Sequence, residues 1–170
     1  MAWVSPSPNL RTLTEATLYP GVAVIESANI SVGRGTGTPF ELVGAPWIST
    51  AGARELAVYL NARQISGVRF IPTSFIPTSS QFAGERCDGV NILLLDRETL
   101  DAPEVGLELA AALYQLYPDK FQLDKIQPLL ANAIAYQALQ AGRDPRRIAE
   151  DGRDAVEAFM LLRQKYLLYK

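Results

Sequence analysis

The 170-residue sequence contains no histidine and only one cysteine, Cys87. Histidine is the commonest general base near neutral pH and the commonest zinc ligand, and its absence removes both roles. A single cysteine can form neither an intrachain disulfide nor a thiolate cluster. Any chemistry must therefore come from carboxylates, tyrosine, lysine, serine or threonine, or from a neighbouring domain, and we expect no metal and no cofactor.

A strong charge of one sign and a long apolar run are also missing. The formal net charge is −2 at pH 7, which gives no electrostatic basis for binding nucleic acid. Apolar runs such as NILLLD are too short to span a bilayer. The opening MAWVSPSPN lacks the basic and apolar regions of a signal peptide. The immediate start of an extended-looking Trp3–Val4 is as compatible with a piece excised from a longer protein as with a natural N-terminus.

The order of sequence patterns predicts a single α+β (mixed α/β) domain over residues 1–170. The first ~100 residues combine short helices with extended segments, and they predict a small mixed sheet covered by helices. Thr12 and Glu15 have the spacing of a capping box, VAVIES (22–27) reads as a strand, and the apolar 89–96 predicts a central strand. FIPTSFIPTS (70–79) holds two prolines, which confine it to a sheet edge.

The C-terminal half is predicted to be helical. Its helices cover 103–117, one or two pieces of 123–141, a segment that starts with Asp144 as N-cap and Pro145, and a closing helix over 153–169. The closing helix carries one apolar face, which we expect to lie in the core; its members are Val156, Phe159, Leu162 and Tyr166, with Tyr169 extending the aromatic stripe.

A glycine-rich loop, NISVGRGTGTPFE (29–41), is the most unusual local pattern. A phosphate site would need a helix directly after the glycines, but Pro39 leads into an extended segment and no G-K-[ST] is present. Two interpretations stay open: a wide turn in which glycines supply positive φ, or a loop that faces a ligand or an interface. The second rests on its hydrogen-bonding side chains, Asn29, Ser31, Arg34, Thr36, Thr38 and Glu41.

Carboxylates at the two ends of this loop are the weak catalytic candidates. Glu26 precedes the loop and Glu41 ends it, and glycoside hydrolysis needs two carboxyl groups that face one bond. The alternative is that both pair with Arg34 or accept backbone N–H bonds. Asp96, at the end of the predicted central strand, is either a site residue or an acceptor for loop N–H groups, and Cys87 is expected to be a small buried hydrophobe.

Several longer stretches resemble a known family. They are P-S-P-N at 6–9, Y-P-G at 19–21, S-x-G-R-G-T at 31–36, P-F-E at 39–41, G-A-P-W at 44–47, FIPTSSQFAGERCDGVNILLLDR, LYPDKF and the terminal KYLLY. In this order and over nearly the whole chain, they are similar to the C-terminal domain of NamZ-type exo-β-N-acetylmuramidases, a family long described as a domain of unknown function.

The resemblance implies a bacterial glycoside hydrolase that releases terminal N-acetylmuramic acid from peptidoglycan fragments, secreted or held in the cell envelope. It implies an N-terminal Rossmann-like domain that carries the catalytic carboxylate, with a cleft at the domain junction. This chain would be the auxiliary C-terminal domain that forms one wall of the cleft, and alone it is expected to be inactive. Its substrate-binding residues would be Asn29, Ser31, Arg34, Thr36 and Glu41.

The sequence departs from the family pattern at three positions. These are Val32, Gly37 and Gly152, where many relatives have an acid, a threonine and a tryptophan. Arg34 either contacts the lactyl carboxylate of muramic acid or fixes the loop at the domain junction.

Two other functions of the chain stay open beside the auxiliary domain of a muramidase. One is a non-catalytic cell-wall-binding or protein-interaction module, and the other is a self-sufficient hydrolase that uses Glu26 and Glu41.

Overall fold

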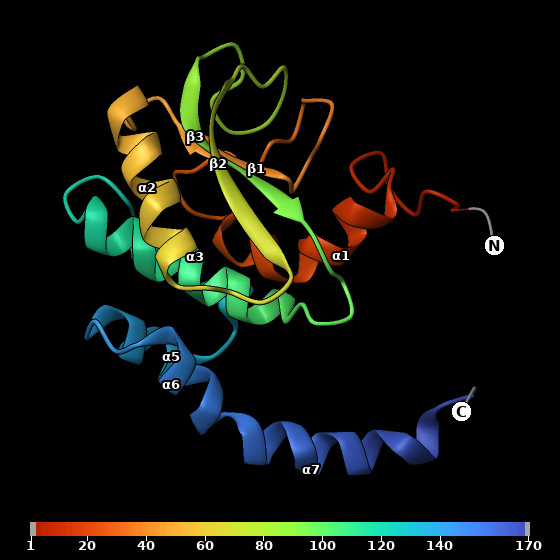
Figure 1. Cartoon of the computed structure of the whole chain (residues 1–170). Coiled ribbons are helices and arrows are strands. Elements are labelled where there is room, and N and C mark those ends of the chain that lie inside the picture. Colours follow the sequence, from red (N-terminus) through yellow and green to blue (C-terminus); the bar gives the residue numbers. More distant parts are fainter. Residues whose placement is uncertain (1–2, 169–170) are drawn as a thin grey trace.

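A computed structural model describes residues 3–168 and contains one three-stranded sheet (Figure 1). Its strands are β1 (Leu42–Ala45), β2 (Val68–Phe75) and β3 (Cys87–Leu94), in the order β1-β3-β2. Both pairings are antiparallel, with Val43 opposite Val90 and Phe70 opposite Ile92, so the sheet is antiparallel rather than mixed. The predicted central strand is confirmed, and β2 with its prolines is an edge strand.

Helices make up most of the rest, and the predicted α+β class with a helical C-terminal half is confirmed. No helix within residues 3–168 is long and apolar enough to cross a membrane. The helical elements are α1 (Leu13–Val22), η1 (Ala23–Ile25), α2 (Thr50–Ala62), α3 (Ala102–Leu116), η2 (Leu123–Ile126), α4 (Gln127–Leu130), α5 (Ala133–Gln140), α6 (Pro145–Asp151), α7 (Arg153–Arg163) and η3 (Gln164–Tyr166).

Side-chain caps start several of these helices, as the sequence predicts. The hydroxyl of Thr12 accepts from the Glu15 N–H, and the Glu15 carboxylate accepts from the Thr12 N–H at 2.9 Å, which completes the capping box. Ser49 caps α2 through the Gly52 N–H at 3.0 Å. Asp144 caps α6 ahead of Pro145, through the Arg146 N–H at 2.9 Å.

The core lies between the sheet, α2 and the crossing pair α1–α3. Helix α2 packs on β2 and β3, while α1 and α3 pack against each other beneath the sheet (Figure 1). The crossing is close because glycines meet there: a Cβ on Gly106 would lie 2.5 Å from the carbonyl oxygen of Gly21. Only glycines allow two helix backbones to approach this closely.

A buried carboxylate joins α6 to the rest of the fold. The side chain of Glu108, on α3, is fully buried and receives two hydrogen bonds of 2.8 Å from Arg63. Arg63 also pairs with Asp144 at 2.8 Å, and Arg146 pairs with Glu104 at 3.5 Å. A buried charge is tolerated when it is paired in this way, so the network fixes the direction in which the chain leaves α6.

Besides the mixed sheet, two further predictions from the sequence are wrong. Residues 22–27 form the end of α1 and η1 instead of a strand, and α1 continues through Pro20. The closing helix α7 has no buried residue, so its apolar face is not part of the core. Tyr169 lies outside the described residues.

Candidate functional site: the glycine loop

The glycine loop (29–41) is tied at its base by backbone hydrogen bonds. Ser31 and Gly44 exchange two bonds, of 2.8 and 3.0 Å, which adds Ser31 to the edge of β1 as an isolated bridge. The Phe40 N–H donates to the Val32 carbonyl at 2.8 Å and closes the loop. Ser31 is buried, and its hydroxyl accepts from the Gly33 N–H at 3.3 Å. The base is therefore a fixed structure rather than an open chain.

Arg34 is held between a carboxylate and an aromatic ring. Its guanidinium donates to both oxygens of Glu26, with 3.0 Å from Nη2 to Oε2. The guanidinium carbon also lies 4.9 Å from the centre of the Phe40 ring, and Tyr19 meets that ring edge-on at 4.9 Å. The hydrogen bonds that Arg34 donates to Glu26 are the main cause that raises the pKa of Arg34. Planar pairing with a carboxylate and stacking on a ring both suit the guanidinium group of arginine. The guanidinium of Arg34 is therefore already bound by Glu26 and Phe40.

The middle of the loop is stabilised from within and by Arg11, which precedes the N-cap of α1. The Thr36 hydroxyl donates to the Gly33 carbonyl at 2.6 Å and accepts from the Thr38 N–H at 3.2 Å. Nη2 of Arg11 donates to the carbonyls of Thr36 and Gly37 at 3.2 and 2.5 Å. Both hydrogen bonds of the Thr36 hydroxyl are therefore made to the backbone of the loop itself, as is common for hydroxyl groups in turns.

The tip of the loop rests on the segment that follows β2. Gly35 has φ +78°, and its carbonyl accepts from the Thr78 N–H and hydroxyl at 3.1 and 2.7 Å. A Cβ at Gly35 would lie 2.4 Å from the Ser79 nitrogen. Both the positive φ and the close approach require glycine here.

Asn29 connects the start of the loop to the segment after α3. Its amide nitrogen donates to the Lys120 carbonyl at 2.8 Å, and its amide oxygen accepts from the Gln122 N–H at 2.9 Å. Its carbonyl accepts from the Trp47 indole at 3.0 Å, and Trp47 meets Tyr117 edge-on at 5.4 Å. Like Ser31 and Thr36, Asn29 uses its polar atoms to hold the backbone in place.

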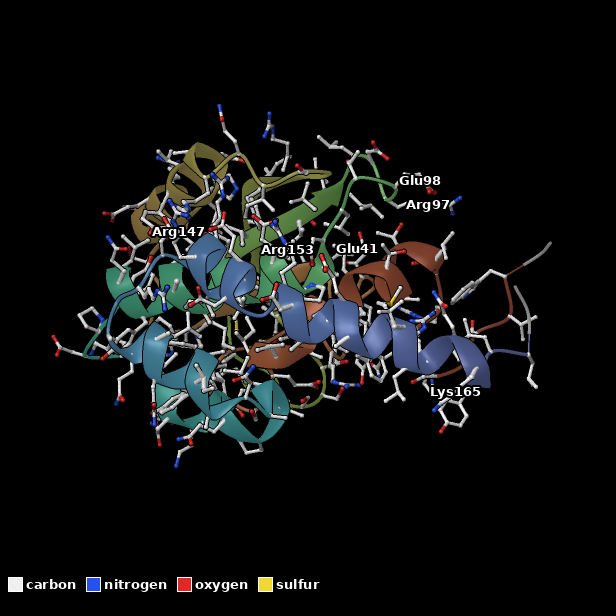
Figure 2. The ribbon with its side chains drawn as sticks, turned by 90° about the horizontal axis from the view of Figure 1, so that it is seen from below. Glu41, Arg97, Glu98, Arg147, Arg153 and Lys165 are labelled. Carbon is white, nitrogen blue, oxygen red and sulfur yellow. The ribbon has the colours of Figure 1, made fainter. Side chains whose placement is uncertain are left out.

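Glu41 differs from Glu26 in its environment. Its side chain makes no hydrogen bond or ion pair with any residue from 3 to 168. Burial, and to a smaller extent the charge of Glu15, raises the pKa of the Glu41 carboxyl. It lies on the side of the molecule that α7 crosses (Figure 2). Of the two carboxylates proposed from the sequence, Glu26 is paired with Arg34 and Glu41 is available for a further contact.

A second polar cluster, around Asp88, was not identified from the sequence. The Asp88 carboxylate accepts from Thr50 at 3.1 Å and Arg86 at 3.2 Å, and it also accepts from Ser74. The bond from Ser74 is the main cause that lowers the pKa of Asp88. These residues lie beside a groove of about 350 Å³ lined by Thr50, Ala53, Arg54, Pro72, Thr73 and Ser74. Its members come from three separate elements, so no local spacing marks them.

The remaining candidates have structural roles. Asp96 accepts from the Glu98 N–H at 3.0 Å and from the Thr99 hydroxyl at 3.1 Å, which is the loop-capping alternative. Cys87 is buried, and burial raises the pKa of its thiol to about 11. Within residues 3–168 no group of three histidine, cysteine, aspartate or glutamate side chains could hold a metal ion.

Comparison with known families then identifies the chain. The profile described as "Exo-beta-N-acetylmuramidase NamZ, C-terminal" matches residues 17–169. The chain belongs to the NamZ C-terminal family. The motif residues that suggested this family are the ones that build the glycine loop: Arg34 and Phe40 stack, Thr36 closes a turn, and Trp47 holds Asn29.

Known NamZ relatives are longer than this chain. The peptidoglycan beta-N-acetylmuramidase NamZ of Bacillus subtilis (strain 168) is 35% identical over 172 residues, which covers 99% of this chain and 41% of the relative. Crystal structures of two DUF1343 family proteins from Bacteroides fragilis NCTC 9343 each match with a TM-score of 0.72 at 27% and 25% identity. They cover 100% and 98% of this chain, which in turn spans 46% and 44% of theirs.

Proposed function

We propose that the chain is the C-terminal domain of a bacterial exo-β-N-acetylmuramidase, a glycoside hydrolase that releases terminal N-acetylmuramic acid from peptidoglycan fragments. The observation that carries this proposal is the 35% identity to the Bacillus subtilis enzyme over 99% of the chain. The chain spans less than half of that relative, so an N-terminal Rossmann-like domain would supply the rest of the enzyme. The complete protein would act outside the cytoplasm, in the envelope or the medium, where its substrate is found.

In this proposal the glycine loop forms a rigid part of one wall of the substrate cleft. Asn29, Ser31 and Thr36 hold the backbone of the loop, and Arg34 braces it through Glu26. A guanidinium engaged by a carboxylate would have to break that pair before it could bind the lactyl carboxylate of muramic acid. Arg34 therefore positions the loop, and Glu41 is the side chain with a free carboxyl to offer a sugar hydroxyl.

The test of this function compares two proteins on a chromogenic N-acetylmuramic acid glycoside. The chain over residues 1–170 should show no turnover. Glycoside hydrolysis needs two free carboxyl groups, and of Glu26 and Glu41 the first is paired with Arg34. The same chain joined to the polypeptide encoded directly upstream should hydrolyse the glycoside. Turnover by residues 1–170 alone would instead support a self-sufficient hydrolase, and inactivity of the longer protein on every muramic acid glycoside would contradict the proposal.

Substitution of Arg34 separates its two roles in the longer enzyme. If Arg34 braces the loop, Arg34→Ala should lower kcat/KM for muramic acid and glucosamine glycosides by the same factor, because the wall itself is displaced. If Arg34 reads the lactyl carboxylate, the loss should be confined to the muramic acid glycoside and should fall mainly on KM. Glu26→Gln, which removes the charge of the bracing partner, should reproduce the first pattern only.

A second candidate function, binding of cell-wall glycan by the domain itself, is favoured by one surface feature. Two grooves of about 640 and 360 Å³ adjoin, because both are lined by Tyr114, Pro118 and Gln140. Tyr59 and Tyr136 extend the lining, and all three tyrosines are partly exposed. Tyrosine rings and amide side chains are suited to the apolar faces and hydroxyls of sugars.

Sedimentation with insoluble peptidoglycan tests this second function on residues 1–170. Binding that Tyr114→Ala weakens, and that Tyr166→Ala leaves unchanged, would support it, because Tyr166 is an exposed tyrosine outside both grooves. Failure of the unmodified domain to sediment with peptidoglycan would eliminate it and leave the hydrolase proposal untouched.

A further inference from the structure

Helix α7 exposes a continuous apolar stripe. Every described residue from 153 to 168 is exposed, and no residue of α7 is buried. Val156, Phe159, Leu162 and Tyr166 repeat every three or four residues, and Phe159 and Tyr166 are 58% and 71% exposed. Burial of each such side chain is worth about 1.5–3 kcal/mol, so a stripe left in water marks an interaction surface.

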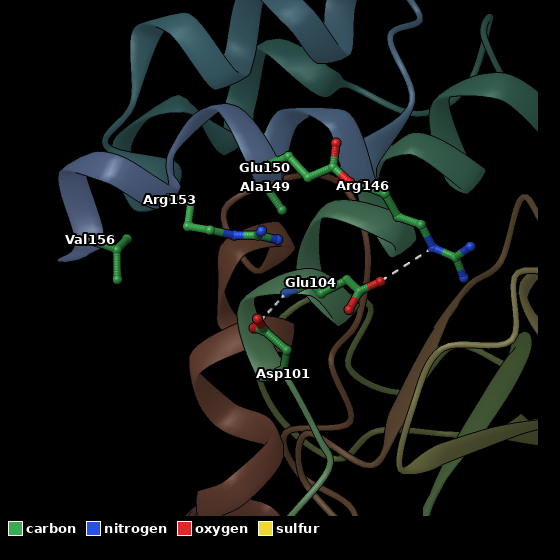
Figure 3. A pocket seen from close by; sticks show the side chains of 7 residues that line it. All are labelled: Asp101, Glu104, Arg146, Ala149, Glu150, Arg153 and Val156. Carbon is green, nitrogen blue, oxygen red and sulfur yellow. Dashed lines mark hydrogen bonds and ion pairs between the residues drawn. The ribbon is translucent and has the colours of Figure 1, made fainter.

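The stripe begins at a groove between α7 and the start of α3. Val156 lines this groove of about 350 Å³ together with Asp101 and Glu104 (Figure 3). Phe159 follows Val156 at helical spacing on α7, Tyr166 lies in η3 directly after it, and α7 runs beneath α1 (Figure 1). Helix α1 itself exposes Leu13 and Tyr19. Apolar side chains are therefore presented from two helices.

The direction of α7 is set by its connection to α6. Asp144 and Arg146 hold the start of α6 on Arg63 and Glu104, and Arg143 pairs with Asp151 at its end at 2.6 Å. Gly152 joins α6 to α7 with φ −81° and ψ −9°, which are helical values. The arm thus projects from an anchored helix.

The lengths of the relatives and the position of the chain start indicate which polypeptide covers the stripe. The matching profile describes a C-terminal domain, and the chain spans 41–46% of its relatives, so their remaining residues precede this part. The first described residues, Trp3 and Val4, are exposed and lie on the same side of the molecule as the end of α7 (Figure 1). A polypeptide that precedes Trp3 would enter beside the stripe.

We infer that the stripe of α7 and the exposed face of α1 clamp the domain that precedes this chain, so that α7 is an interdomain arm. This inference rests on the proposed function for the existence of that domain. The arm would bury Phe159, Leu162 and Tyr166 against an apolar surface of the preceding domain. Glu41 would lie at the same junction, because it is on the side of the molecule that α7 crosses (Figure 2).

Hydrogen exchange in the longer protein tests the inference. In residues 1–170 alone the amides of α7 should exchange rapidly, since the helix has no tertiary cover. In the protein with its upstream polypeptide they should exchange at least about tenfold more slowly. Phe159→Glu should abolish this protection. The matched control is Leu161→Glu: Leu161 is equally apolar and 70% exposed, but it projects about 200° away from Phe159 around the helix.

Three outcomes overturn the inference: equal exchange of α7 in both proteins, equal loss of protection in both variants, or an upstream sequence that encodes no domain. Concentration-dependent protection of α7 in residues 1–170 alone would assign the stripe to a second copy instead. An upstream sequence that encodes no domain contradicts both proposals. Where the domain is present, exchange does not depend on catalysis, so the two proposals fail separately. Protection without muramidase activity contradicts the proposed function only, and activity with an unprotected α7 contradicts the arm only.

Discussion

Arg34 illustrates how single residues determine the shape of the glycine loop. Backbone hydrogen bonds such as Phe40 N–H to the Val32 carbonyl close the loop, and Arg34 connects its middle to Glu26 at the end of η1 and to the ring of Phe40. Phe40 is fully buried with φ +65°, a conformation that a bulky residue adopts only when its surroundings hold it there. The Arg34 stack and the edge-on contact of Tyr19 provide those surroundings.

Cys87 should be unreactive in the folded protein. It is buried, and burial raises the pKa of its thiol to about 11, so the nucleophilic thiolate is scarce at pH 8. With Ellman's reagent at pH 8 we expect a negligible rate for the native protein and one thiol per chain after denaturation in guanidinium chloride. Rapid labelling of native protein would show that the start of β3 opens.

Asp88 should make the stability of the domain depend on pH in acid. The Ser74 hydroxyl, with Thr50 and Arg86, lowers the pKa of Asp88 in the folded state. The stabilisation by its charge is therefore complete above the unfolded value of about 3.9 and is lost as pH falls through the lowered folded pKa. Asp88→Asn should cost about 1–3 kcal/mol of unfolding free energy at pH 7.

The difference between Asp88→Asn and the unmodified chain should shrink below about pH 3.9, and urea unfolding at a series of pH values measures it. Ser74→Ala removes the main donor and should give a smaller effect with the same pH dependence. A constant difference from pH 7 to pH 2.5 would contradict the role of the Asp88 charge.

At the scale of elements, capping and proline patterns were reliable guides because they act locally. Thr12 with Glu15 and Asp144 with Pro145 start α1 and α6 as predicted. The strand predicted over 22–27 failed because Val22 and Ile25 continue a helical stripe that begins at Leu18; the three are buried at i, i+4 and i+7. Tertiary packing on α3 overrides the local preference of valine and isoleucine for strands.

The glycine contact between α1 and α3 predicts opposite effects of two Gly→Ala changes. A Cβ at Gly106 would lie 2.5 Å from the Gly21 carbonyl oxygen, so Gly106→Ala must push the helices apart and should cost about 1–3 kcal/mol. At Gly152 the nearest atom to such a Cβ is 3.5 Å away and the backbone is helical, so Gly152→Ala should stabilise by up to ~1 kcal/mol. Urea unfolding of both variants measures the two signs, and destabilisation of equal size would refute the packing argument.

At the scale of the whole molecule, the domain consists of a packed body and one uncovered arm. The apolar spacing of α7 was visible in the sequence, but its partner was not, because periodicity shows that a face should be buried without showing against what. The same limit applies to the Asp88 cluster, whose members come from α2, β2, and β3 and its approach. Contacts between distant elements depend on how those elements pack, which local patterns do not encode.

This division predicts that the arm adds almost nothing to the stability of the body. None of the described residues that a truncation after Gly152 removes, 153–168, belongs to the hydrophobic core, so the melting temperature should change by less than about 2 °C. A control truncation that removes residues 132–170 deletes the buried Ala135, Leu139 and Ile148 and should lower the melting temperature much further. Differential scanning calorimetry of the two truncations compares them. A large loss of melting temperature on removal of 153–170 alone would mean that α7 packs on the body of the domain in solution. The apolar stripe would then be covered by the same chain and not by a preceding domain.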